Sequence, residues 1–161
     1  MDGDSSGTKW NQEVIGIEND IYVVRYGKEI RGLDKNTMNH LFGIDKNNRR
    51  TKFTGSRSKV LDFPLYVGKK WRNNSSFTDK RGGRWNVSEA YSVSSHEDVK
   101  VVGGTFRAFK IEYGHSDTRT GKELASATYW YSPEVKAIVK LVEFKSLTVG
   151  NMELISYELA Q

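Results

Sequence analysis

Apolar and polar residues alternate along much of this chain, and this period of two is the feature that most constrains its fold. Between residues 85 and 94, Trp85, Val87, Tyr91 and Val93 occupy odd positions, whereas the even positions hold asparagine, alanine and serine. Successive side chains of a β-strand point to opposite faces of the sheet, so this pattern predicts a strand with one buried face and one wet face.

Many other segments share this alternation or are short β-branched runs, which favour strands over helices. The predicted strands are Val14–Glu18, Ile21–Tyr26, Met38–Ile44, Lys59–Phe63, Leu65–Trp71, Asp98–Val102, Thr105–Tyr113, Ala125–Tyr131, Val135–Phe144 and Ile155–Leu159. No window has the spacing of an amphipathic helix. We therefore predict an all-β fold of consecutive antiparallel strands, forming a strongly curved sheet or a half or partly closed barrel.

Turn residues stand between several of these strands. Gly103-Gly104 predicts a two-residue hairpin, which places Lys100 opposite Arg107. Like charges in directly opposed positions repel, so a longer turn is the alternative. Gly82-Gly83 is a second candidate turn.

Three more turns are predicted from side-chain chemistry. Proline at the second position of Ser132-Pro133-Glu134 favours a type I turn. Asp34 and Asp45 are the second residues of two similar segments, Leu33–Asn36 and Ile44–Asn47. Aspartate in such a setting accepts hydrogen bonds from the backbone two residues on. We interpret the two segments as Asx turns and not as an internal repeat.

The length of 161 residues suits one domain. We expect one antiparallel β domain over residues 9–161, preceded by a flexible tail over residues 1–8, which has no apolar residue after Met1. This tail lacks the basic start and apolar stretch of a signal peptide. The chain is therefore either cytoplasmic, if Met1 is the native start, or the mature part of an exported protein. No apolar run is long enough to predict a membrane span.

The chain carries a net charge of +5, which attracts phosphate-rich partners. Its basic residues gather in short clusters among turn residues: Lys46, Arg49, Arg50, Lys52, Arg57 and Lys59; Lys69, Lys70 and Arg72; Lys80, Arg81 and Arg84. Solvated loops explain these clusters, and binding of an anionic polymer through basic loops is the alternative. No recognition motif accompanies the charge, so nucleic acid is not an expected partner.

Few residues suggest catalysis or metal binding. The chain has no cysteine, and its three histidines (His40, His96 and His115) are far apart in the sequence. His115 and Asp117 are close, but the glycine before them predicts a surface loop. No motif for a nucleophile or a phosphate-binding loop is present. We therefore expect no cofactor, no metal and no enzymatic activity.

Aromatic residues are enriched, at 12% of the chain. Trp71, Trp85, Tyr129, Trp130 and Tyr131 are the candidate ligand-binding residues. Alternation sends Trp130 to one face of its strand and the two flanking tyrosines to the other. One interpretation is that Trp130 is buried in a core that fills itself, against Ala137 and Val139 across the turn; the other is an aromatic-lined cavity for a lipid or other apolar ligand.

Four blocks of sequence resemble a pattern found in uncharacterised bacterial cell-envelope proteins. They are Phe63–Trp71 (FPLYVGKKW), Glu97–Glu112 (EDVKVVGGTFRAFKIE), Ala127–Lys136 (ATYWYSPEVK) and Glu153–Tyr157 (ELISY). Together they span residues 60–160. The chain departs from the pattern at Val102-Gly103, where these proteins more often have Pro-Ala.

The resemblance implies an all-β fold and export to the cell envelope, since many of these proteins are lipoproteins or periplasmic proteins of unknown function. It brings no catalytic residues. Our hypothesis is therefore a non-enzymatic binding or structural module of the bacterial envelope, located in the periplasm or anchored to the outer membrane in its full-length precursor. A carrier of an apolar molecule and a binder of anionic polymers are the alternatives.

Overall fold

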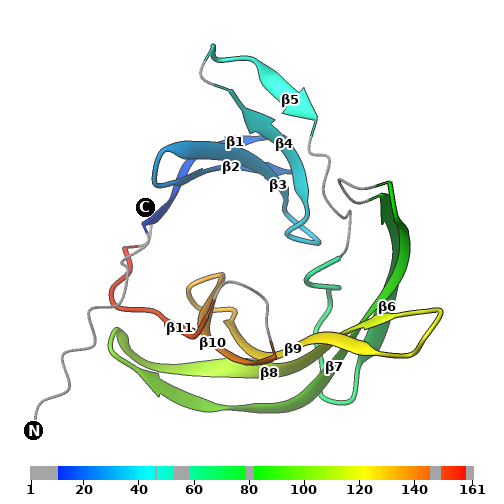
Figure 1. The fold of residues 1–161 in the computed structure, drawn as a ribbon. Helices are drawn as coiled ribbons and strands as arrows, with labels where there is room; N and C mark the ends of the chain where they lie inside the picture. Colours follow the sequence, from blue (N-terminus) through cyan, green and yellow to red (C-terminus); the bar gives the residue numbers. More distant parts are fainter. Residues whose placement is uncertain (1–10, 46, 53–58, 79–81, 146–149, 159–161) are drawn as a thin grey trace, which may run out of the picture. The chain divides into compact units, whose positions relative to one another are not determined.

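The computed structural model describes residues 11–45, 47–52, 59–78, 82–145 and 150–158 (Figure 1). The predicted tail, residues 1–8, lies outside this part of the chain. The chain divides into two compact units, an N-terminal unit up to Phe63 and a C-terminal unit from Pro64 onward. All regular structure in the described residues is β-strand.

The N-terminal unit contains a five-stranded antiparallel sheet in which each strand pairs with the next along the chain. Its strands are β1 (Gln12–Glu18), β2 (Ile21–Tyr26), β3 (Glu29–Asp34), β4 (His40–Ile44) and β5 (Arg50–Lys52). The first two connections are two-residue turns, in which Asn19 and Gly27 adopt positive φ values. Such turns match the twist of the strands that they join.

The C-terminal unit contains a six-stranded antiparallel sheet in the order β11-β10-β9-β8-β7-β6, which curves strongly along the long strands β7 and β8 (Figure 1). Its strands are β6 (Lys70–Thr78), β7 (Arg84–Val101), β8 (Gly104–Asp117), β9 (Glu123–Ser132), β10 (Ala137–Lys145) and β11 (Met152–Glu153). Each of these strands also pairs with its neighbour in sequence.

The all-β prediction and the antiparallel order of consecutive strands are confirmed, with the strands divided between two sheets. Three predicted segments are wrong in detail. Lys59–Phe63 is a loop, in which the Leu61 amide donates to the Thr37 carbonyl oxygen. Leu65–Trp71 is strand only from Lys70, after a turn at Gly68, and Ile155–Glu158 is not strand. The pattern also missed β3, β5, β11 and the part of β6 after Trp71.

A β-bulge in β7 explains how the long strands bury residues on both faces. Val93 pairs with Ile111, but Ser95 pairs with Lys110, so Ser94 is the extra residue. A bulge of one residue reverses which parity faces which side. Before the bulge, the odd-numbered residues of β7 lie on the same face of the sheet as Ile111. After the bulge, they lie on the opposite face, together with Lys110.

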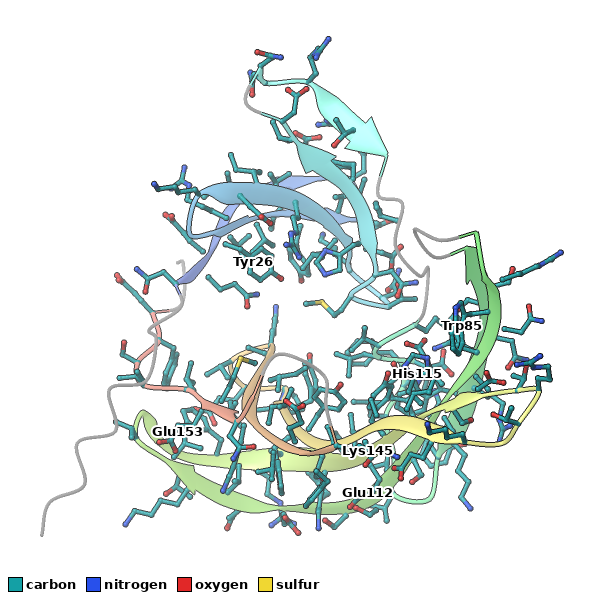
Figure 2. The ribbon with its side chains drawn as sticks, viewed as in Figure 1. Tyr26, Trp85, Glu112, His115, Lys145 and Glu153 are labelled. Carbon is teal, nitrogen blue, oxygen red and sulfur yellow. The ribbon has the colours of Figure 1, made fainter. Side chains whose placement is uncertain are left out.

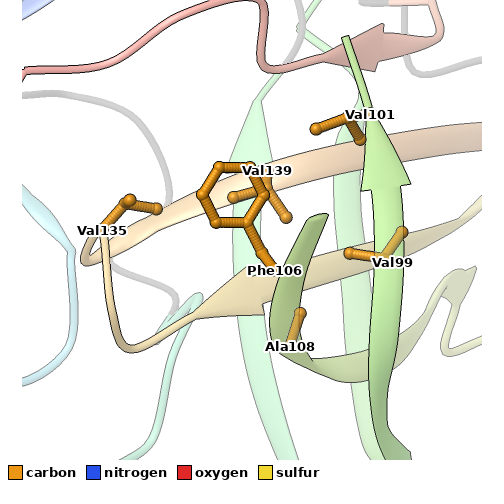
Figure 3. Packing of buried hydrophobic residues seen from close by; sticks show 6 residues of the cluster. All are labelled: Val99, Val101, Phe106, Ala108, Val135 and Val139. Carbon is orange, nitrogen blue, oxygen red and sulfur yellow. The ribbon is translucent and has the colours of Figure 1, made fainter. Parts of the chain in front are cut away.

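Beyond the bulge, the face of Lys110 carries an apolar cluster near the β7–β8 turn (Figure 3). Its buried members are Val99, Val101, Phe106, Ala108, Val135 and Val139, and Trp130, Ala137 and Leu154 pack against them. Burial of such side chains stabilises the fold by about 1.5–3 kcal/mol each for valine and phenylalanine. β8 therefore buries side chains on both of its faces, and the apolar cluster stabilises the end of the sheet near the β7–β8 turn.

The β7–β8 turn lies one residue earlier than predicted. Val101 pairs with Gly104, so the two turn residues are Val102 and Gly103. This register places Asp98 opposite Arg107, whose guanidinium lies 3.3 Å from the carboxylate, and replaces the predicted repulsion by an ion pair. The connection remains a two-residue hairpin.

The other predicted turns are confirmed where the structure describes them. Asp34 Oδ1 accepts from the amides of Asn36 and Thr37, and Asp45 Oδ1 accepts from those of Asn47 and Arg49. Residues 133–136 form the turn between β9 and β10. Gly82 has a positive φ in the β6–β7 connection, of which residues 79–81 lie outside the described part.

Candidate functional site

Four aromatic side chains follow one another across β6, β7, β8 and β9 on the Ile111 face, which we call the aromatic row: Trp71, Tyr91, Tyr113 and Tyr129. Trp71 stacks on Tyr91 with ring centroids 5.0 Å apart, and Tyr91 lies 5.0 Å from Tyr113. Tyr113 meets Tyr129 edge to face at 5.7 Å. These are favourable separations for aromatic pairs, so the rings fill this face together.

Two polar side chains border the aromatic row. Glu89 pairs with His115 across β7 and β8, and its Oε1 accepts a hydrogen bond from the Tyr113 hydroxyl at 3.4 Å. Glu89 Oε2 and His115 Nε2 are buried without a hydrogen-bond partner among the described residues. Figure 2 shows His115 and Glu112 on opposite sides of β8, as their parity requires.

Burial raises the pKa of all three tyrosines in the row. For Tyr91 and Tyr113 the nearby Glu89 carboxylate adds to the effect, and the pKa values lie well above the usual range. For Tyr129 burial, with Glu89 and Glu143, raises the pKa to about 12. All three hydroxyls therefore keep their protons at neutral pH.

The sequence candidates are divided between the two faces, as alternation predicted. Trp71, Trp85, Tyr129 and Tyr131 lie on the side of the aromatic row, because their register positions share its parity. Tyr131 is buried and pairs with Phe109, whereas Trp85 lies near the start of β7 and is 37% exposed. Only Trp71 and Tyr129 are members of the row itself.

Trp130 lies on the opposite face, where it is half-buried and packs against the apolar cluster that contains Val139. Its indole Nε1 donates to Glu97 Oε1 at 2.9 Å, and the ammonium groups of Lys110 and Lys140 lie 5.8 and 5.4 Å from its ring. The hydrogen bonds from Trp130 and Ser95 hold the pKa of Glu97 below its usual range.

A pocket of about 320 Å³ lies at the other end of the sheet, beside Trp85. We call it the arginine pocket, and it is lined by Gly83, Arg84, Trp85, Asn86, Asp117 and Arg119. Gly83 and the first three residues of β7 supply four of these residues, and the end of β8 and the β8–β9 turn supply Asp117 and Arg119. The pocket is thus built where two connections meet.

The β8–β9 turn is held by an Asx turn that the sequence reasoning missed. Asp117 Oδ1 accepts from the amides of Arg119 and Thr120, at 2.8 and 3.0 Å. These hydrogen bonds lower the pKa of Asp117, so it is charged at neutral pH. Thr118 then ties the turn to β7, since its amide and hydroxyl both donate to the Asn86 carbonyl oxygen.

The histidines are distributed over both units. His115 lies within β8 and not in the surface loop that was predicted, since the strand continues through Gly114 to Asp117. His40 lies in β4, where burial and Arg31 lower its pKa, and His96 stacks on Phe109. Among the residues that the structure describes, no group of three or more histidines or carboxylates could hold a metal ion.

The sequence named Trp85 as a candidate ligand-binding residue, Arg84 as part of a basic cluster and Gly83 as part of a turn, but it did not predict that Arg119 lines the same pocket. The signal was present in Asp117–Thr120, where an aspartate precedes a turn as it does at Asp34 and Asp45. Pairing of the strands across the sheet was needed to bring the two arginines together.

No protein-family model and no curated protein matches the chain. No helix in the described part of the chain is long and apolar enough to cross a membrane. Among solved structures, the fold is similar to that of the hypothetical lipoprotein YmcC from Escherichia coli K12, with a TM-score of 0.51 and 15% sequence identity. The match covers 85% of this chain and 73% of that one, and therefore includes residues of both units. The chain thus shares its fold with a hypothetical lipoprotein of Escherichia coli.

Proposed function

We propose that this protein is a non-enzymatic binding module of the bacterial cell envelope, and that it binds through the arginine pocket. The observation that carries the proposal is the contrast between the two aromatic regions of the C-terminal unit. The aromatic row is packed ring against ring, whereas Trp85 lies at an open pocket beside two exposed arginines.

The packing of the aromatic row supports a structural role for it. Tyr91 and Tyr113 are 5% and 7% exposed, so little of either ring is left for a ligand to contact. Burial raises the pKa of both hydroxyls, as expected for side chains packed in a core. Because the aromatic side chains fill this face of the sheet themselves, the packing also argues against the alternative that the protein carries an apolar ligand.

The envelope location is supported by two independent likenesses. The sequence motifs of residues 60–160 resemble those of envelope proteins, and the fold is similar to that of an Escherichia coli lipoprotein. We propose that the full-length precursor is periplasmic or anchored to the outer membrane.

The test is co-sedimentation of the purified protein with bacterial envelope fractions. We expect Trp85→Ala to lose most of the bound protein, because Trp85 is one of the residues that line the pocket. Phe144→Ala is the control, since Phe144 is also an exposed aromatic residue but lies outside the pocket. Equal binding by both variants would contradict the proposal. Stoichiometric uptake of a fluorescent fatty acid, lost in Trp71→Ala, would favour the carrier instead.

A further inference from the structure

The lining of the arginine pocket includes two arginines from separate connections. Arg84 begins β7 and Arg119 lies in the β8–β9 turn, and both are exposed. Within the described ranges, neither forms an ion pair with a carboxylate, in contrast to Arg25, Arg31 and Arg107. Their donors are therefore available to an external acceptor.

The Asp117 carboxylate balances only part of the positive charge of Arg84 and Arg119. Asp117 is 5% exposed, and its Oδ1 already accepts two backbone hydrogen bonds. With Asp117 charged, the described residues that line the pocket carry one net positive charge, which suits a singly charged anion better than a cation or a neutral group.

The pocket is also held in place before any ligand arrives. The Asx turn at Asp117 and the two hydrogen bonds from Thr118 to Asn86 fix the backbone of the turn that bears Arg119. A preformed turn lowers the entropy lost on binding. An arginine side chain on such a turn binds an oxyanion with two parallel hydrogen bonds at a modest ordering cost.

We infer that the arginine pocket binds the phosphate oxyanion of an envelope component, with Arg84 and Arg119 donating to its oxygens and Trp85 contacting the body that carries it. This inference rests on the proposed function, because it assumes that this pocket is the binding site. The volume of about 320 Å³ is enough for a phosphate and part of a ring or glycerol unit.

Binding of inorganic phosphate to the full chain is measured from the changes in the amide chemical shifts of Arg119 and Thr120 in nuclear magnetic resonance spectra. Vesicles of phosphatidylglycerol, with phosphatidylcholine as the comparison, test whether a lipid headgroup supplies the phosphate. We expect Arg84→Gln and Arg119→Gln each to weaken phosphate binding about tenfold or more, as loss of a charge-assisted hydrogen bond does. Saturable shifts with inorganic phosphate and no preference for phosphatidylglycerol would indicate a non-lipid source and would still support the inference.

Arg72→Gln is the matched control, because Arg72 is an exposed arginine of β6 and the variant has the same net charge. It should bind as the wild type does. Equal weakening in Arg72→Gln and the pocket variants would show attraction by net charge alone and would overturn the inference. Loss of envelope binding in Trp85→Ala, with full binding in both pocket arginine variants, would overturn the phosphate site and leave the proposed function standing.

Discussion

Position 32 in β3 requires glycine, because the ring of Phe42 on the neighbouring strand occupies the space that a Cβ atom would need. A Cβ atom at position 32 would lie 2.3 Å from Phe42 Cε1, closer than side-chain atoms approach. Phe42 is 9% exposed and has little room to move. We expect Gly32→Ala to lower the free energy of unfolding by about 1–3 kcal/mol, as overpacking does, measured by urea denaturation. Gly43→Ala is the control, since its nearest contact would be 3.4 Å; equal losses would contradict the argument.

Tyr129 gives a pH-dependent prediction. Its pKa is about 12 in the folded protein against 10.0 in the unfolded chain. Between these values the unfolded state loses the phenolic proton while the folded state keeps it, so stability falls as pH rises above about 10. The fall is about 1.4 kcal/mol per pH unit for each such tyrosine at most. Tyr129→Phe should show a shallower loss between pH 10 and 12 in denaturation series; an unchanged slope would refute the assignment.

Trp130 combines a hydrogen bond and two cationic neighbours with contact to the apolar cluster. Replacing a fully buried tryptophan with alanine lowers the free energy of unfolding by about 3–5 kcal/mol. Because the Trp130 ring is half-buried, we expect Trp130→Ala to lower it by less. Trp130→Phe keeps the apolar contact but removes the donor to Glu97, and should recover part of the loss. A loss above this range in thermal or urea unfolding would show that the ring is buried after all.

At the level of strands, the period of two predicted most of the sheet elements because a half-buried strand imposes it directly. It missed β3 because Gly32 occupies a core position where the pattern requires a large apolar side chain, and Phe42 supplies the missing volume from β4. It gave a false strand at Lys59–Phe63 because a loop that buries Leu61 carries the same local pattern. The bulge at Ser94 has no local signal, since it depends on the pairing with β8.

The candidate site was less predictable than the strands for the same reason. Alternation correctly divided Trp130 from Tyr129 and Tyr131, since this depends only on parity. The arginine pocket depends on which connections lie side by side, which follows from sheet register and not from local sequence.

The C-terminal segment is attached to the β7–β8 turn at Gly103. The Gly103 amide donates to the Leu154 carbonyl oxygen at 2.8 Å, and Tyr157 contacts Phe106 edge to face. A Cβ atom at Gly103 would lie 3.0 Å from the carbonyl oxygens of Leu154 and Ile155. We expect Gly103→Ala to displace this segment, with faster hydrogen exchange at the Leu154 amide and an unchanged Ile111 amide. Unchanged exchange at Leu154 would contradict the contact.

At the scale of the whole molecule, the two units differ in the size of their cores. The described core of the N-terminal unit consists of Val23, Val24, Leu33, Phe42 and Leu61, and the other buried apolar side chains belong to the C-terminal unit. A unit of this length with so small a core is marginal on its own, since chains of about 60 residues bury only about 60% of their unfolded surface.

The length of 161 residues predicts a single domain over residues 9–161, and a single domain is expected to unfold in one cooperative transition. Native-state hydrogen exchange tests this directly. The slowest amides of each sheet, such as Leu33 in β3 and Ile111 in β8, should converge on one free energy of opening and one dependence on denaturant. Calorimetry should then give equal calorimetric and van't Hoff enthalpies. Two separate transitions, with Leu33 exchanging at a clearly lower free energy than Ile111, would show that the N-terminal unit unfolds independently and that the single-domain prediction is wrong.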